Sequence, residues 1–279
     1  MRLDRTSLAA LALAAVLSGM LPAGRALALD DNAGVKIGRK SLFAKLVSAD
    51  KLEQASALQY DAMTRQALQK RKLVDERDPQ VVRLRRIFKA LEPHTLKFND
   101  RAKNWRWEVN LIESQQINAF CMPGGKIAFF SGILERLKLT DDEVAMIMGH
   151  EMGHALWEHA RERTAKTNIT NIGSRVIGGL LFGQAGEVIG AAGASLATLK
   201  FSRNDETEAD LIGLELAARA GFDPRAGITL WQKMSQAAKG APPQWLSTHP
   251  SGKSRIETLE KNIPDVLALY ERARSERPR

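Results

Sequence analysis

Hydrophobic residues recur at helical spacing through most of the chain. Between residues 38 and 91, leucines and other apolar residues stand three or four positions apart among Lys, Arg, Glu and Gln, which predicts amphipathic helices. The pair Asp78-Pro79 interrupts this segment and predicts that a new helix begins there, with Pro79 in its first turn.

Two longer helices are predicted further along the chain. Residues 140–166 begin with Thr140 and Glu143, the pair that forms a capping box, and continue with a regular apolar face. Residues 201–221 form the second, which Gly221 is expected to end. Shorter helices are predicted over residues 131–138, 222–239 and 255–261, followed by a basic C-terminal helix. Residues 247–255 are predicted to form a loop.

Strand-like alternation is confined to one region. Residues 105–113, 117–122 and 126–130 alternate or run apolar, with a Pro-Gly-Gly turn before the last of them. They predict a small antiparallel sheet directly before the helix over 140–166, so the fold class is mainly α (α+β). The Gly- and Ala-rich segment 173–199 is expected to form two closely packed helices or a flap, with a membrane span as the alternative.

Composition narrows the function classes. The 279 residues carry a formal charge of +9, but Lys and Arg are spread among acids, which indicates a solvated basic surface. No helix-turn-helix, zinc finger or aromatic RNA-binding pattern is present, so nucleic acid is not an expected partner. Cys121 is the only cysteine, which excludes an intramolecular disulfide and a thiolate metal site.

The first 28 residues resemble a secretory signal peptide. Arg2 and Arg5 precede an apolar stretch, and Ala26-Leu27-Ala28 fits a cleavage site. We expect a cleaved signal and a periplasmic location, with an uncleaved signal anchor as the alternative. Met20 stands where a lipoprotein would carry its lipidated cysteine, so lipidation is not expected.

The most specific pattern is His150-Glu151-Met152-Gly153-His154. Four residues of helix advance about 400°, so His150 and His154 point the same way, one turn apart. Two imidazoles in this arrangement can bind one zinc ion, and Glu151 stands beside them, where a carboxylate can take a proton from water.

A catalytic zinc site keeps three protein ligands, so a third is needed. Ala160 occupies the position at which a metzincin has its third histidine. We interpret His159 as a surface residue and His94 as an exposed loop residue. Glu206 is therefore the predicted third ligand, since Asp210 lies on the same helical face and can accept the free ring N–H of a zinc-bound histidine.

Four sequence blocks resemble the zinc metallopeptidases of family forty-eight, the superfamily of the HtpX, Oma and CAAX endopeptidases, and in particular its single-domain LoiP- and BepA-like branch. The blocks are residues 118–127, 143–154 and 202–213, and residues 247–250 together with 255–256. The resemblance implies a zincin-type helical peptidase domain over residues 91–279, with residues 29–90 as a helical segment packed on it. It implies one Zn²⁺ per chain held by His150, His154 and Glu206.

The same resemblance implies roles for further residues. Glu151 is the implied catalytic acid and base, and Asp210, Arg255, Asn118 and Phe120 are implied to support the ligands or to line the substrate cleft. His249 is the candidate oxyanion donor; a zinc ligand in a latent resting state is the second interpretation of it. The expected function is hydrolysis of misfolded or unassembled envelope proteins, including outer-membrane proteins. A zinc-containing chaperone, a membrane-bound processing peptidase and peripheral membrane association remain alternatives.

Overall fold

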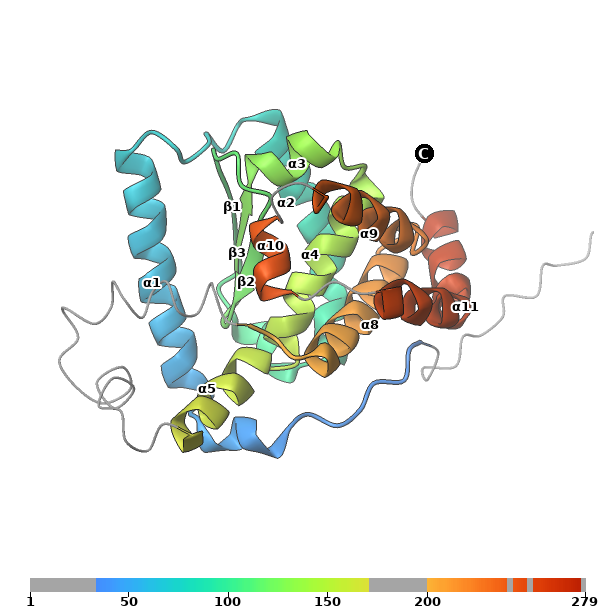
Figure 1. Cartoon of the computed structure of the whole chain (residues 1–279), viewed down its shortest axis with the longest axis horizontal. Helices are drawn as coiled ribbons and strands as arrows, with labels where there is room; N and C mark the ends of the chain where they lie inside the picture. Colours follow the sequence, from blue (N-terminus) through green and yellow to red (C-terminus); the bar gives the residue numbers. More distant parts are fainter. Residues whose placement is uncertain (1–33, 171–199, 240–242, 250–252, 277–279) are drawn as a thin grey trace, which may run out of the picture. The chain divides into compact units, whose positions relative to one another are not determined.

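A computed structural model describes residues 34–170, 200–239, 243–249 and 253–276 (Figure 1). The predicted signal peptide and the Gly- and Ala-rich segment 173–199 lie outside the described residues. The helices and strands in chain order are η1 (Leu42–Leu46), α1 (Ala49–Gln69), α2 (Pro79–Leu91), η2 (Glu92–Lys97), η3 (Asp100–Asn104), β1 (Glu108–Ile112), β2 (Ala119–Met122), β3 (Lys126–Phe130), α3 (Ser131–Leu137), α4 (Asp141–Leu156), α5 (His159–Thr170), α8 (Arg203–Arg219), α9 (Ala226–Ala237), α10 (Gln244–Thr248) and α11 (Lys253–Glu276).

The predicted helix starts are confirmed by their caps. Pro79 stands in the first turn of α2, after the N-cap residue Asp78. Thr140 and Glu143 form the expected capping box at the start of α4. Gly221 follows α8 with a φ of 72°, the left-handed conformation that glycine adopts without strain.

The small sheet has the strand order β1-β3-β2 and is mixed rather than antiparallel throughout. The turn after β2 makes β2 and β3 an antiparallel pair, as expected, but β3 then pairs in parallel with β1. The reason is that β3 enters between the other two strands, so that the loop of residues 113–118 carries the chain across the sheet. Short apolar segments predict strands but not the direction of their partners.

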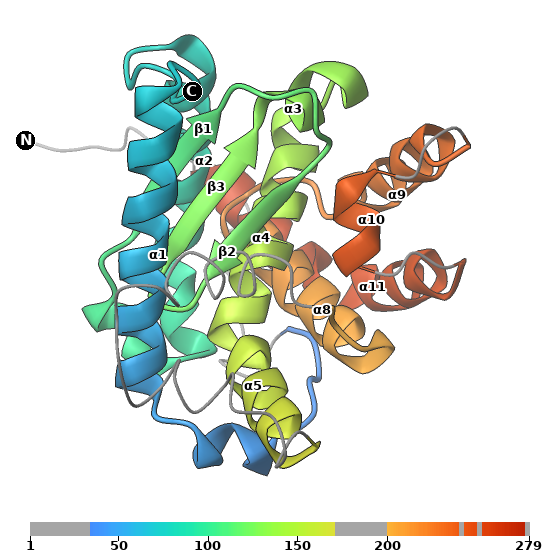
Figure 2. The ribbon, with the colours of Figure 1, turned by 60° about the vertical axis from the view of Figure 1, so that its left-hand side comes forward.

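Helices cover both faces of this sheet: α1 lies on one face and α4 on the other (Figure 2). On the α1 face, the fully buried Tyr60 donates a hydrogen bond to the carbonyl oxygen of Ile127 on β3. Phe120 and Met122 of β2 pack in the same apolar cluster. The opposite face of the sheet contacts α4, which holds the His-Glu-x-x-His motif.

The backbones of α4 and α8 approach each other closely through glycines. A Cβ atom at Gly213 of α8 would lie 2.6 Å from the backbone nitrogen of His150, and one at Gly149 would lie 3.0 Å from the Gly213 backbone. Such a close approach requires residues without side chains on both helices. It sets the distance between the motif histidines and the acidic residues of α8.

Two predicted helix boundaries are wrong. The helix expected over 140–166 ends at Leu156, and α5 begins at His159 after Glu158 takes a left-handed φ of 65°. At the C-terminus, α11 is continuous through Pro264, where two helices were expected. The buried residues Leu259, Ile263 and Val266 keep one apolar face across the proline, and this packing outweighs the backbone hydrogen bond that proline cannot make.

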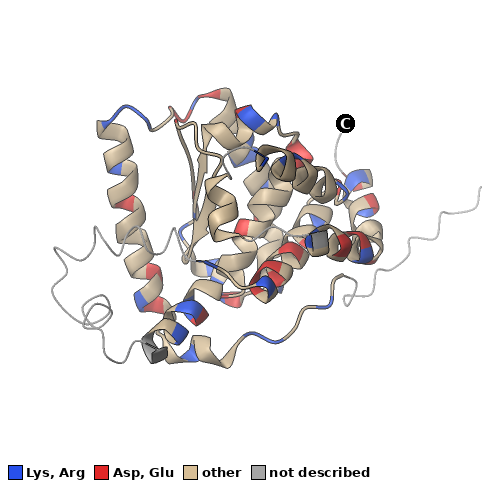
Figure 3. Cartoon of the chain, viewed as in Figure 1, with Lys and Arg blue, Asp and Glu red and all other residues tan. Residues whose placement is uncertain are grey.

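Blue Lys and Arg segments and red Asp and Glu segments are scattered over the helices in view rather than gathered on one of them (Figure 3), as the spread of charges in the sequence indicates. Among the described residues, no helix combines the length and apolarity that a membrane crossing requires.

Candidate metal centre and active site

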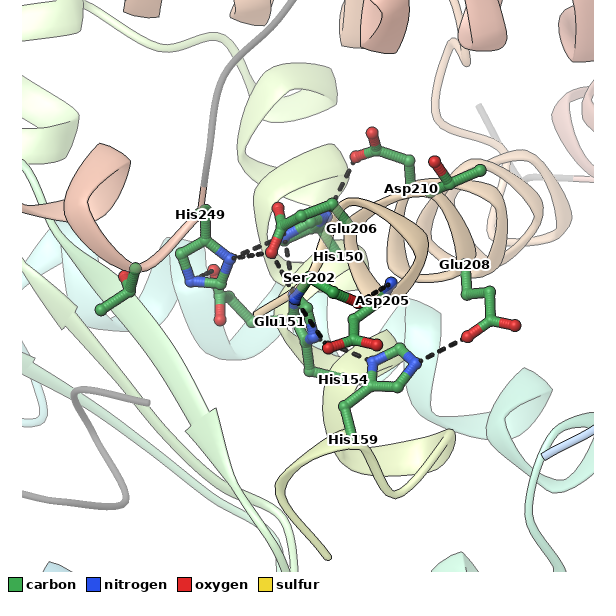
Figure 4. A network of polar contacts seen from close by, with 12 residues as sticks. His150, Glu151, His154, His159, Ser202, Asp205, Glu206, Glu208, Asp210 and His249 are labelled. Carbon is green, nitrogen blue, oxygen red and sulfur yellow. Dashed lines mark hydrogen bonds and ion pairs between the residues drawn. The ribbon is translucent and has the colours of Figure 1, made fainter. Parts of the chain in front are cut away.

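Three elements converge on one buried point. α4 brings His150 and His154, which lie one turn apart on the face toward α8. α8 begins with a capping box of Ser202 and Asp205, and its next residue, Glu206, points at the two imidazoles (Figure 4). His249 follows directly after α10. All four side chains are buried, with 3% exposure at most.

Donor atoms of the four side chains lie close together around one point. His150 Nε2 lies 3.1 Å from His154 Nε2 and 3.2 Å from His249 Nδ1. Glu206 Oε1 lies 3.1 Å from His249 Nδ1 and 3.5 Å from His154 Nε2, and Glu206 Oε2 lies 3.6 Å from His150 Nε2. Ligand atoms about 2.0–2.1 Å from a tetrahedral zinc ion are separated by roughly 3.3–3.4 Å. The observed spacings fit a cation of this size at the centre.

The hydrogen bonds around the cluster leave lone pairs facing that centre. Asp210 Oδ1 lies 3.0 Å from His150 Nδ1, so the carboxylate holds the ring proton on Nδ1 and Nε2 keeps its lone pair. Arg255 in turn donates to both oxygens of Asp210, at 2.6 and 2.5 Å, and to Glu206. Its guanidinium also stacks on Trp231, with 3.8 Å between the guanidinium carbon and the ring centroid.

These ion pairs keep the acidic residues charged in a buried place. Burial alone would raise the pKa of Glu206 and of Asp210, but the positive charges around them outweigh it and lower both pKa values. Burial lowers the pKa of His154 well below the usual histidine range, with the neighbouring His150 adding to the effect. A neutral imidazole is the form that binds a metal.

Glu151 lies next to this donor set and is 2% exposed. Its Oε1 atom accepts a hydrogen bond of 2.6 Å from the indole nitrogen of Trp245 and lies 3.6 Å from His249 Nε2. Burial lowers the pKa of His249, but the charges of Glu151 and Glu206 outweigh burial and raise it. The donor cluster, with Glu151 beside it, fits a divalent metal with a carboxylate base next to it.

Comparison with known proteins agrees with this geometry. Residues 82–263 match peptidase family M48. The chain belongs to peptidase family M48. Peptidases of this family depend on a metal, and the cluster of His150, His154, Glu206 and His249 is where this member can hold one.

Relatives within the family carry several names. The chain is 32% identical over 257 residues to the mitochondrial metalloendopeptidase OMA1 of Bos taurus, which is 84% of this chain and 46% of that protein. It is 32% identical over 159 residues to the beta-barrel assembly-enhancing protease of Yersinia pestis, 52% of this chain and 32% of that protein. It is 27% identical over 153 residues to the metalloprotease LoiP of Escherichia coli, 54% of this chain and 60% of that protein. The chain thus spans less than two thirds of these relatives.

The interpretation of His159 as a surface residue is wrong. His159 is fully buried, and its Nδ1 atom lies 2.9 Å from His154 Nδ1. An unbroken helix would turn His159 away from His154, but the left-handed residue Glu158 ends α4 and brings His159 back. His94 is also not in an exposed loop, since it lies half-buried in η2.

Of the two remaining candidates, Phe120 of β2 faces away from the cluster, and Asn118 directly precedes β2. Phe120 packs beside Tyr60 on the α1 face of the sheet. The carbonyl oxygen of Asn118 accepts from the backbone nitrogen of Phe130, so residues 118, 120 and 122 direct their backbone groups toward β3. The outer edge of β2 therefore presents the backbone of Ala119 and Cys121 instead.

Trp245 is a site residue that sequence reasoning missed. Its indole contacts Glu151, and its ring stacks on His249 with 4.8 Å between the centroids. The available signal was its position four residues before His249, which is one helical turn.

Proposed function

We propose that the protein is a zinc-dependent endopeptidase. The observation that carries this proposal is the close clustering of three imidazole nitrogens and one buried carboxylate, with the carboxylate of Glu151 beside them. A buried site built from nitrogen and oxygen donors is typical of zinc. His150, His154 and Glu206 are the proposed permanent ligands.

The proposed reaction is hydrolysis of a peptide bond. A bound zinc ion supplies a lowered water pKa and polarises the scissile carbonyl. Glu151 takes the proton of the attacking water and later returns a proton to the leaving nitrogen. Asp210 and Arg255 keep His150 and Glu206 in position during these steps, since together they hold both side chains by hydrogen bonds.

His249 is proposed as a ligand of the resting state. Its Nδ1 atom lies among the donors, 3.2 Å from His150 Nε2 and 3.1 Å from Glu206 Oε1, so it would take the fourth position that water needs, while Trp245 donates to the base Glu151. Water and substrate can therefore reach the metal site only after α10 and His249 move away from it. This interpretation predicts that His249→Asn raises peptidase activity, whereas an oxyanion donor at His249 predicts a loss.

The edge of β2 is the proposed binding place for an extended substrate backbone. Ala119 and Cys121 direct backbone groups outward there, and added strands bind through such groups. Two residues before Ala119, on the same edge, the carbonyl oxygen of Ile117 accepts a hydrogen bond from the backbone nitrogen of Trp245. The resting position of α10 therefore uses part of the edge that a substrate would use.

The proposed substrates are misfolded or unassembled envelope proteins. The protein would meet them in the periplasm, to which residues 1–28 would direct it as a signal peptide. This part rests on the signal-like sequence and on the name of one relative, a beta-barrel assembly-enhancing protease. N-terminal sequencing of the exported protein tests it: a start near Leu29 is expected, and an intact Met1 contradicts signal cleavage.

The competing function is a metal-containing chaperone without turnover. A casein digestion assay with zinc-loaded protein separates the two. We expect Glu151→Gln to abolish cleavage while zinc stays bound, and the exposed Glu135→Gln, the matched control, to cleave as the unaltered protein does. Undiminished proteolysis by Glu151→Gln contradicts the assignment of the base, and no cleavage by any of the three proteins favours the chaperone.

A further inference from the structure

His159 and Glu208 form a hydrogen-bonded pair behind the candidate metal ligand His154. His159 Nδ1 lies 2.9 Å from His154 Nδ1, and His159 Nε2 lies 3.0 Å from Glu208 Oε2 (Figure 4). The His159 side chain is fully buried, and that of Glu208 is 25% exposed. The proposed function has so far given neither residue a role.

The direction of these hydrogen bonds follows from the chemistry of imidazole. A metal on His154 Nε2 requires a lone pair there, so the ring proton of His154 stays on Nδ1. His154 then donates to His159 Nδ1, which accepts only if its own proton lies on Nε2. Glu208, a carboxylate, accepts that proton and holds His159 in the required tautomer.

The ring proton of His150 is also held by a carboxylate of α8, without an intermediate residue. Asp210 Oδ1 lies 3.0 Å from His150 Nδ1 and fixes its proton directly. On His154 the carboxylate acts through an intermediate residue, because His159 lies between His154 Nδ1 and Glu208. One helix thus supplies a ligand at Glu206 and a tautomer-fixing carboxylate for each histidine, at Glu208 and Asp210.

His159, Glu208 and the nearby Asp205 could also be read as a second metal site, because their donor atoms cluster. The hydrogen bonds argue against that reading. Asp205 Oδ2 accepts from Arg163 at 2.8 and 2.6 Å and from the backbone nitrogen of Ser202 at 2.8 Å. His159 directs one nitrogen to His154 and the other to Glu208, so both are already engaged.

We propose that His159 and Glu208 are positioning residues that fix the proton of His154 on Nδ1 and so present its Nε2 lone pair to the metal. The proposal rests on the metal site of the proposed function. It requires that His159 act as a hydrogen-bond acceptor, which separates it from a role in packing alone.

Two substitutions at His159 distinguish its role as a hydrogen-bond acceptor from the effect of its side-chain volume on packing. His159→Asn retains an acceptor oxygen near the place of Nδ1, and His159→Leu fills similar space without one. We expect zinc affinity, measured by chelator competition, to fall about 10–100-fold in the Leu variant and less in the Asn variant, as for other partners of metal-bound histidines. Glu208→Leu is expected to weaken zinc binding as well, and His94→Leu, a half-buried histidine elsewhere, to leave it unchanged.

Nitrogen-15 NMR of the histidine rings gives a readout independent of activity. We expect a protected Nδ1 proton on His154 in the unaltered protein and in His159→Asn, and its loss in His159→Leu. Unaltered zinc affinity and an unaltered His154 ring spectrum in His159→Leu and Glu208→Leu overturn the proposal. If His159→Leu does not fold, Glu208→Leu alone decides. Failure of the unaltered protein to bind zinc overturns the metal site itself, and with it this proposal.

Discussion

The contact between α4 and α8 makes Gly213→Ala the most informative change outside the metal donors. A Cβ atom at this position would lie 2.6 Å from the backbone nitrogen of His150 and 2.9 Å from the carbonyl carbon of Gly149. Ordinary contact begins at 3.4 Å, so the approach is too close by about 0.8 Å (3.4 minus 2.6). Both neighbouring atoms are backbone, and the helices must therefore move apart.

The separation has two costs. Overpacking of a filled core costs about 1–3 kcal/mol, of which the better helix propensity of alanine offsets about 1 kcal/mol. In addition, Glu206 and His150 lie on opposite helices, and metal–ligand distances tolerate only about 0.2 Å. Even a third of the displacement exceeds this tolerance. We expect a much lower zinc affinity together with a net loss of stability of roughly 0–2 kcal/mol in the metal-free protein.

Gly227→Ala is the matched control, because the atoms nearest to its Cβ are the flexible ends of Met146 and Leu259, at 2.9 and 3.2 Å. The assay is zinc competition combined with urea unfolding with and without zinc. The control should bind zinc as the unaltered protein does. Equal zinc affinity and equal stability of Gly213→Ala and the unaltered protein would refute the reasoning, since the two helices could then not be in backbone contact.

Three further outcomes are expected. Burial raises the pKa of Glu143, but its bonds to Lys233 and to the α4 cap outweigh burial and lower the pKa below the usual 4.5. Such a carboxylate stabilises the fold above its unfolded pKa and loses this effect as the pH falls through the folded pKa. Urea unfolding should therefore show Glu143→Gln to be destabilising at pH 7 and less so as the pH falls through the lowered folded pKa; a pH-independent difference would speak against this role. Tyr60→Phe should cost about 1–3 kcal/mol in the same assay, because the Ile127 carbonyl and the Asn110 amide lose a buried partner; an unchanged unfolding curve would contradict that bond. Removal of metal by a chelator should lower the melting temperature, and added zinc should restore it, with a gain of about 4 kcal/mol in the free energy of unfolding at a thousandfold excess over the dissociation constant; a melting temperature indifferent to both means that no folded-state metal site exists.

The ligand face could be predicted because local signals agree there. The capping box at Thr140 fixes where α4 begins, and four-residue spacing then directs His150 and His154 to the same side. Spacing on α8 likewise brought Glu206 and Asp210 together on one face. The same reasoning left two roles open for His249, and only its distance from the other donors favours one of them.

What escaped prediction depends on single backbone conformations and on long-range contacts. The periodic pattern continues through Glu158, so nothing in it indicates the left-handed residue that returns His159 to the site. The parallel pairing of β1 and β3 joins segments whose sequences specify strand but not partner. Trp245 reaches Glu151 across 94 residues of sequence, a contact that depends on where the folded chain places α10 beside Ile117.

X-ray absorption at the zinc edge tests most directly whether the imidazoles of His150 and His154 share one metal with Glu206. We expect one zinc per chain with four nitrogen or oxygen neighbours at about 2.0–2.1 Å and the outer-shell scattering of imidazole rings. We also expect Glu206→Gln to weaken zinc binding and Glu135→Gln to leave the spectrum unchanged. Zinc that binds without imidazole scattering, or that binds equally well without the Glu206 carboxylate, would contradict a metal shared by these three residues.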